Sequence, residues 1–277
     1  MTARSAALVL SGGGAKTAAH LGAYRALREA GFEPAWYVAT SMGAVVAAGL
    51  ASGVSGDELL ELIAEVGPSG VVREPLAAIA GLFGRSLLKP TPLRRAIETL
   101  VPARRFADLA VPLTVSAVDL DTGELVLFGA GAQTAPLIDV LCASCALPMY
   151  YPPVVLNGRH LGDGGLRGVV PLEPAAELAV ELVLAVDVGP GFDDTESNGG
   201  VRVPPMVRAH DAAVGILMAA NSEAQLALWR ADPGRPPLVY VRPKVERNAT
   251  FRVDRVREYA VEGRRATRDA LERWGDS

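Results

Sequence analysis

The sequence has few cysteines, few histidines and no excess of positive charge, and each shortage excludes a class of protein. Its two cysteines, Cys142 and Cys145, and its three histidines do not supply the second ligand pair that a zinc site requires. Lys and Arg total 27 against 31 Asp and Glu, and the net charge of −4 argues against a nucleic-acid-binding surface. We therefore expect no metal, no cofactor and no nucleic acid, and we interpret the cysteines as small buried hydrophobic residues.

The sequence also lacks any apolar run that approaches the length of a membrane-spanning helix. Its first ten residues contain too short an apolar segment for a signal peptide and continue directly into a run of glycines. We therefore expect a cytoplasmic protein. The composition leaves open a transient, peripheral contact with a membrane surface through apolar residues, and it points to no particular protein partner.

Apolar residues, by contrast, are abundant and make up 50% of the 277 residues, which is enough to bury a sizeable core. No internal repeat and no linker divides the chain, so we expect one domain over residues 1–277. Predicted strands and helices alternate in the first part of the chain. This alternation predicts an α/β fold, with a mostly parallel sheet and helices on both of its faces.

Apolar runs bounded by turn signals predict the strands, and longer runs predict the helices. The predicted strands are 6–11, 36–38, 111–117, 125–128, a hairpin over 152–161, 182–188 and 238–241; the predicted helices are 18–30, 44–51, 57–66, 93–100, 135–147, 203–230 and 253–274. Residues 67–92 are rich in glycine, proline and apolar side chains, among them Phe83 and Leu87. Such a composition predicts a lid of short helices beside a substrate entrance, and the alternative interpretation is that these apolar side chains pack in the core.

The chain is organised around Ser41, which lies where the apolar stretch 36–38 meets a helix of small residues, 44–51. A serine at such a junction is typical of the nucleophile elbow, a sharp strand-to-helix turn that exposes Oγ beside the backbone N–H groups of the helix start. This turn requires small residues two positions before and after the serine, and Ala39 and Gly43 meet the requirement. The alternative interpretation is a helix N-cap, for which serine is a preferred residue.

A glycine loop, residues 12–14, follows the first predicted strand and precedes a helix. Glycines at this place let backbone N–H groups surround an anion, which is either a phosphate or the oxyanion of an acyl intermediate. A phosphate-binding P-loop requires glycine where this chain has Ala15 and Leu10, and the third glycine of a dinucleotide-binding loop falls on Thr17. The oxyanion interpretation is left, beside that of a tight turn with no ligand.

An aspartate, Asp163, follows the predicted hairpin and is flanked by glycines, Gly162 before it and Gly164 and Gly165 after it. Taken alone, it is an ordinary turn aspartate. Its informative property is its place in the order of motifs: glycine loop, elbow serine, and then Asp-Gly-Gly.

These motifs, in this order, resemble those of the patatin-like phospholipase family of serine acyl hydrolases. The matched stretches are Leu-Ser-Gly-Gly-Gly-Ala-Lys (10–16), Ala-Thr-Ser-Met-Gly (39–43), Ala-Ser-Cys-Ala-Leu-Pro (143–148), Asp-Gly-Gly (163–165) and the strand 183–188. The resemblance covers about residues 6–190 and leaves a helical C-terminal part, about 200–277, outside it. Three motifs in the right order are far more specific than any one of them.

The resemblance implies a three-layer patatin-like fold and a lipid acyl hydrolase that acts on phospholipid or lysophospholipid. It implies a catalytic dyad, with Ser41 as the nucleophile and Asp163 as the general base. It also implies an oxyanion hole formed by the amides of Gly12, Gly13, Gly14 and Ala15. The residues that support these motifs are Lys16, Ala39, Gly43, Gly164 and Gly165.

Three positions depart from the family pattern. Ala39 replaces the first glycine of the elbow, Thr17 replaces the glycine that usually ends the loop motif, and Gly168 stands where an asparagine is common. None of them removes a catalytic group. They leave open a catalytically weak member that binds a lipid or a partner protein.

A different enzyme class remains as an alternative, an α/β-hydrolase with a Ser-Asp-His triad. It would use the same elbow, with Asp163 or Asp187 as the acid and His210 as the base. The elbow of this chain follows only the second predicted strand, whereas that fold places its oxyanion loop after a third strand. We therefore expect His20, His160 and His210 to take no part in proton transfer.

Overall fold

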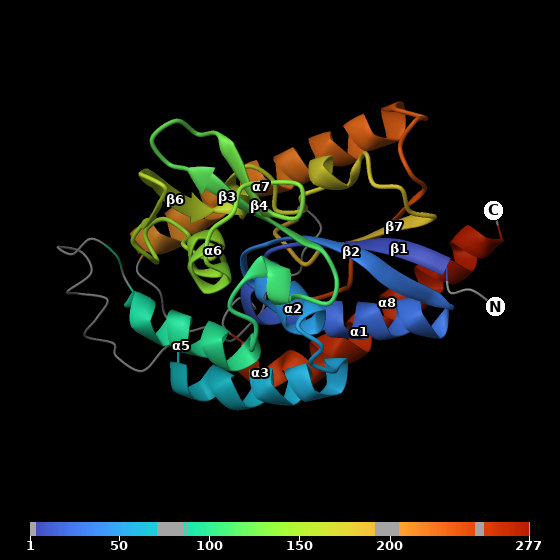
Figure 1. Cartoon of the computed structure of the whole chain (residues 1–277), viewed down its shortest axis with the longest axis horizontal. Coiled ribbons are helices and arrows are strands. Elements are labelled where there is room, and N and C mark those ends of the chain that lie inside the picture. The colour runs from blue at the N-terminus through green and yellow to red at the C-terminus, as the bar shows by residue number, and fades with distance from the viewer. Residues whose placement is uncertain (1–3, 71–85, 87, 192–204, 247–251, 277) are drawn as a thin grey trace.

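The computed structural model describes residues 4–70, 86, 88–191, 205–246 and 252–276. Its centre is an eight-stranded sheet with the order β5-β6-β3-β2-β1-β7-β8, and β4 pairs with β3 beside this path. Helices lie on both faces of the sheet, with α7 on one face and α1, α3 and α8 on the other (Figure 1). The predicted α/β class, with helices on both faces of a mostly parallel sheet, is confirmed.

Five strands of the sheet run parallel to one another. They are β1 (Arg4–Leu10), β2 (Phe32–Thr40), β3 (Leu113–Asp119), β7 (Leu182–Val186) and β8 (Leu238–Val241). The strands β4 (Leu125–Gly129), β5 (Val154–Leu156) and β6 (Arg159–Asp163) pair antiparallel. Parallel strands place their carboxyl ends at one edge, which is where open α/β sheets bind ligands.

The first strand is buried on both sides, because side chains at alternate positions of a strand point to opposite faces. Leu8 and Leu10 join a large core with residues of α1, α2, α3, α5 and α8. Ala7 and Val9 join a smaller core, to which α7 contributes Trp229. This continuous burial explains why β1 has an uninterrupted apolar sequence.

The helices occupy the predicted segments with shifted ends. They are α1 (Ala18–Glu29), α2 (Ser41–Ala51), α3 (Gly56–Gly70), α5 (Pro90–Leu100), α6 (Leu137–Ser144), α7 (Pro205–Ala231) and α8 (Val256–Gly275). The predicted helix 135–147 was too long at both ends, because Pro136 is the N-cap of α6 and the helix ends with Cys145 at its C-cap. Most of the segment predicted to form a lid, including Phe83 and Leu87, lies outside the described residues.

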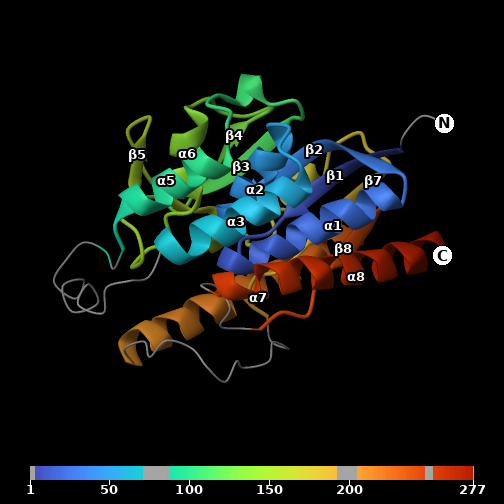
Figure 2. The same cartoon turned by 90° about the horizontal axis from the view of Figure 1, so that it is seen from below.

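The helices α1 and α8 lie side by side along one face of the sheet (Figure 2). Their close approach depends on two glycines. A side chain at Gly22 of α1 would overlap the carbonyl of Ala260, and one at Gly263 of α8 would overlap the carbonyl of Ala19. At each glycine, the backbone of the opposite helix therefore packs against the Cα atom. These two contacts fix the position of α8 relative to α1.

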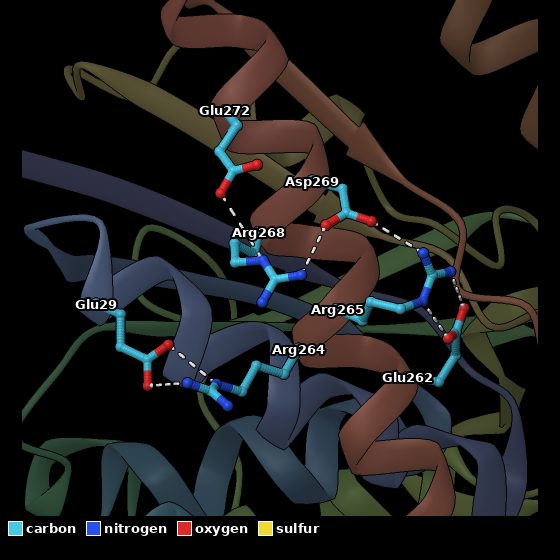
Figure 3. A network of polar contacts seen from close by, with 7 residues as sticks. All are labelled: Glu29, Glu262, Arg264, Arg265, Arg268, Asp269 and Glu272. Atoms are coloured by element: carbon cyan, nitrogen blue, oxygen red, sulfur yellow. Dashed lines mark hydrogen bonds and ion pairs between the residues drawn. The ribbon is translucent and has the colours of Figure 1, made fainter.

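The exposed side of α8 carries a network of ion pairs, which Figure 3 shows. Arg264 pairs with Glu29 of α1 at 3.0 Å, the one pair of this network that joins the two helices. The other pairs lie within α8, at distances of 2.8 to 3.8 Å, and they are Arg265 with Glu262 and Asp269, and Arg268 with Asp269 and Glu272. All of these arginines are about half exposed, so water competes for their charges.

Candidate active site

Ser41 is the first residue of α2, directly after β2, and its φ of 53° lies in the left-handed region. This conformation is strained for a residue other than glycine, and it persists only where the surroundings hold it. Gly43 allows the sharp turn, because a side chain there would overlap the carbonyls of Ser11 and Leu10. Ala39 is fully buried in β2, which lies between β1 and β3, and its single methyl group joins the large core.

The Ser41 hydroxyl donates a hydrogen bond to Oδ2 of Asp163 at 2.7 Å. Asp163 ends β6, and its other oxygen, Oδ1, accepts the amide of Gly165 at 2.8 Å. Strand β3 lies between the two, because Ser116 pairs with Thr40 of β2 while Ala117 pairs with Asp163. The sheet thus brings together two residues that are 122 positions apart in the sequence.

The carboxyl of Asp163 is 6% exposed, and this burial raises its pKa to about 6. The hydrogen bonds from Ser41 and Gly165 act in the opposite direction, because they stabilise the carboxylate. The group is therefore mostly ionised at neutral pH, and it is a stronger base than an exposed aspartate.

The two glycines after Asp163 each serve a steric role. A side chain at Gly164 would overlap the carbonyl of Ser116 and the hydroxyl of Thr40. At Gly165, it would come within 3.0 Å of the Asp163 carboxylate that this residue's own amide binds. Glycine at both positions lets the backbone approach the elbow closely.

The glycine loop lies directly against Ser41, because a Cβ atom on Gly12 would be 3.7 Å from Ser41 Oγ. Gly14 has a φ of 60°, in the left-handed region that favours glycine. The loop leads into a short 3-10 helix, Gly14–Thr17, and then into α1. Lys16 in this turn is buried.

The amides of this loop differ in their availability. The amide of Gly12 donates to the carbonyl of Val169 at 3.1 Å, so it does not face an oxyanion in this arrangement. The expectation that Gly12 contributes to an oxyanion hole stays a prediction, and in this structure its donor joins the loop to Val169. Within the described residues, no backbone or side-chain group accepts the amides of Gly13, Gly14 and Ala15, all of which are partly exposed.

Two polar side chains, those of Ser11 and His20, hold the glycine loop in place through hydrogen bonds. The Ser11 hydroxyl accepts the amide of Val188 at 2.8 Å and donates to the carbonyl of Gly12 at 3.0 Å. His20 of α1 is fully buried, and its Nε2 donates to the carbonyl of Ser11 at 2.9 Å. Burial lowers the pKa of His20 to about 4, so the ring is neutral at physiological pH. The sequence pattern contains no signal for either contact.

The residues of the alternative triad make other contacts. His210 lies 3.3 Å from Asp211, and His160 lies 2.7 Å from Asp121. Asp187 accepts from Arg242 at 2.6 Å and from the hydroxyl of Tyr240 at 2.7 Å. Among the residues that the structure describes, no hydrogen bond joins Ser41 to a histidine.

The departures from the family pattern have local explanations. The Thr17 hydroxyl donates to the carbonyl of Gly14 at 2.7 Å, and this bond closes the loop. Beside Gly168, the space that a side chain would fill is occupied by Gln225 of α7, which donates to the carbonyl of Arg167 at 3.1 Å. A residue of the C-terminal part thus contacts the segment that follows Asp163.

No part of the described chain holds three or more histidine, cysteine, aspartate or glutamate side chains in an arrangement that suits a metal ion. Cys142 and Cys145 are unpaired and buried, as predicted. Over the same residues, none of the helices combines the length and the apolar character needed to cross a membrane.

An elbow serine, a buried aspartate and a glycine loop at the carboxyl edge of a mostly parallel sheet define an α/β protein with a serine–aspartate site. The sequence model of the patatin-like phospholipase family matches residues 8–176. The chain belongs to the patatin-like phospholipase family, a family of lipid hydrolases, and the resemblance drawn from its motifs is confirmed.

Its relatives include an uncharacterized NTE family protein of Mycobacterium tuberculosis, 31% identical over 222 residues, which are 78% of this chain and 59% of that protein. Another is a patatin-like phospholipase domain-containing protein of Caenorhabditis elegans, 30% identical over 68% of this chain and 14% of that protein. The chain thus spans less than two thirds of the length of both. Among solved structures, VipD of Legionella pneumophila superposes with a TM-score of 0.51 at 15% identity, over 98% of this chain and 67% of VipD, and shares the fold.

Proposed function

We propose that the chain is a serine hydrolase of lipid acyl esters, with phospholipid or lysophospholipid as its substrate class. Ser41 acts as the nucleophile and Asp163 as the general base. The observation that carries this proposal is the hydrogen bond of 2.7 Å from Ser41 Oγ to a buried carboxylate. A nucleophile needs such a base within hydrogen-bond reach to lose its proton.

In the first half of the reaction, Ser41 Oγ attacks the ester carbonyl and transfers its proton to Oδ2 of Asp163. The negative charge that develops on the carbonyl oxygen is bound by the amides of Gly13, Gly14 and Ala15. The tetrahedral intermediate then collapses to an acyl-enzyme, and the proton passes from Asp163 to the departing alcohol. Water repeats these steps on the acyl-enzyme and regenerates Ser41.

In this proposal, the glycine loop supplies much of the stabilisation of the transition state. A carboxylate whose conjugate acid has a pKa of about 6 is a far weaker base than the serine alkoxide, so proton transfer alone does not stabilise the transition state enough. One oriented oxyanion donor is typically worth roughly 3 kcal/mol. The positive end of the helix that begins at the loop adds to the effect of the amides.

The decisive experiment is labelling by a fluorophosphonate probe together with hydrolysis of a chromogenic ester. We expect the wild type to be labelled and Ser41→Ala to lose both labelling and hydrolysis while keeping its melting temperature. Ser52→Ala is the matched control, because Ser52 caps the other end of α2 and its hydroxyl bonds to Ala48. Labelling that persists in Ser41→Ala would disprove the nucleophile, and an unlabelled wild type would favour a binding protein.

Replacing the histidines separates the dyad from a triad. We expect His160→Ala and His210→Ala to retain most of the activity. For His20 we use Gln, because its amide can donate to Ser11 in place of the imidazole but cannot act as a base. If one of these folded variants lost as much activity as Ser41→Ala, the dyad would be incorrect.

A panel of lipids, with mass spectrometry of the products, would define the substrate. Release of a fatty acid from phospholipid or lysophospholipid, at a rate above that from neutral lipid and short-chain esters, is the expected result. A preference for neutral lipid would contradict the proposed substrate class and leave the Ser41 chemistry in place.

A further inference from the structure

The amide of Ser41 has a partner that the proposed reaction does not use. It donates to the hydroxyl of Ser144 at 2.7 Å, and that hydroxyl donates in turn to the carbonyl of Ser116 at 2.7 Å. Ser144 is the last residue of α6 and is fully buried. A single hydroxyl thus connects the nucleophile elbow, a helix and the strand β3.

This connection reaches both members of the dyad. Ser116 lies in β3, opposite Thr40, which precedes the nucleophile, and the next residue, Ala117, pairs with Asp163. The carbonyl of Ser116 therefore lies in the strand between β2, which leads to Ser41, and β6, which ends at Asp163. Ser144 is the side chain that ties the elbow to this carbonyl.

The start of α2 has few other means of support. Its N-cap residue, Thr40, makes no side-chain capping bond within the described structure. Ser41 itself has the strained φ of 53°. The first amides of a helix have no partner inside the helix, and Ser144 provides one to the first of them from a distant part of the sequence.

We propose that Ser144 is a positioning residue for the nucleophile: by holding the Ser41 amide against β3, it sets the approach of Ser41 Oγ to Asp163. This inference rests on the proposed function of Ser41. It has a second consequence, because the Ser41 amide is already used by Ser144. The oxyanion hole then depends on the glycine loop rather than on the amide of the nucleophile.

The test compares Ser144→Ala with Ser144→Thr, and uses rates expressed per active site after titration with the fluorophosphonate. Ser144→Ala removes the hydroxyl and leaves the Ser41 amide without its acceptor. We expect acylation per site to slow by about ten- to a hundredfold, with KM within about twofold, because small displacements of reacting groups are costly. Ser144→Thr keeps the hydroxyl and should restore most of the rate.

A pH profile supplies a readout that loss of stability alone does not change. The hydrogen bond from Ser41 lowers the pKa of Asp163, so a displaced elbow should raise the apparent pKa of the acylation rate in Ser144→Ala. The control is Ser222→Ala, which also deletes a buried hydroxyl bonded to a backbone carbonyl, that of Met218. It should leave the rate per site and the apparent pKa unchanged.

The outcomes separate this inference from the proposed function. If Ser144→Ala melts at a lower temperature but acylates at the wild-type rate per site with an unchanged apparent pKa, Ser144 is structural only and the inference is overturned. That result stands even if Ser144→Thr does not fold, because the alanine variant decides it. A wild type that fails to label would instead refute the proposed function, and the positioning role with it.

Discussion

The dyad region and the outer side of α8 both contain many polar groups, but they use them in opposite ways. Around Ser41, the Ser41 amide, the Ser144 hydroxyl and the Asp163 carboxylate are buried or half-buried, and each has one or two specific partners. On α8, the arginines are about half exposed, and Arg265, Arg268 and Asp269 each have two partners. Removing a buried partner leaves its mate without water to replace it, whereas exposed charges are resolvated. We therefore expect the dyad region to be sensitive to single substitutions and the α8 surface to tolerate them.

The largest effect of a single substitution is expected at Asp163, in the dyad region, and it is an effect on kcat. Asp163→Asn keeps the size and polarity of the side chain but removes its basicity. We expect kcat to fall by roughly 10²–10⁴-fold, the usual contribution of a general base. In the wild type, the rate should rise with pH through the pKa of about 6, because the base must be ionised. A rate that does not change across this range would exclude Asp163 as the base.

Asp163→Asn is expected to act in the opposite direction on stability, which it should increase at neutral pH. The pKa of Asp163 is raised from 3.8 to about 6 in the folded state, so its contribution to stability is present below about pH 4 and is lost as pH rises through about 6. A shift of this size corresponds to on the order of 3 kcal/mol. Asp163→Asn should therefore melt above the wild type at neutral pH, and thermal melts should show the difference shrinking towards about pH 4.

An intermediate effect is expected where α1 crosses α8. Gly22→Ala and Gly263→Ala each place a methyl group against a backbone carbonyl of the opposite helix, and we expect a loss of roughly 1–3 kcal/mol in urea unfolding. Gly215→Ala is the control, because among the described residues this helical glycine of α7 has only Pro190 nearby, at 3.6 Å. It should be neutral or slightly stabilising. Equal effects at all three positions would show that α1 and α8 do not pack closely at Gly22 and Gly263.

The smallest effect is expected on the surface of α8. Arg265→Ala removes two ion pairs at a half-exposed position, and we expect less than about 1 kcal/mol, falling further at high salt. Urea unfolding at low and high salt measures it. A loss as large as that of Gly22→Ala would break the comparison, because it would make the exposed network as important as the buried contacts.

Much of the fold could be predicted because its determinants are local. The apolar run of β1 and the glycine after α1 mark their elements without reference to the rest of the chain. The ends of α6 were predicted less well, because Pro136 and Cys145 act through backbone geometry that an apolar pattern does not register.

In the candidate site, the sequence motifs indicated some residues, whereas the contacts that hold these residues in place could not be predicted. Ser41 and Asp163 were selected through family motifs, and their catalytic roles remain predictions. No pattern in the sequence indicated that Val169 accepts the amide of Gly12 or that Ser144 accepts the amide of Ser41, because each contact joins segments whose approach is set by the sheet. Spacing along a chain carries no information about such contacts.

The close packing of α1 against α8 also has a consequence for how the protein is made. Glu29 and Arg264 are 235 positions apart, and the glycine loop is continuous with α1, so part of the loop's support comes, through α1, from a helix synthesised long after it. Contacts between such distant segments form slowly, since the intervening chain must first be ordered. While α8 is still unsynthesised, α1 has an uncovered face that chaperones or other nascent chains can bind. The glycine loop is then among the first segments to be translated, whereas its support from α8 is among the last to form.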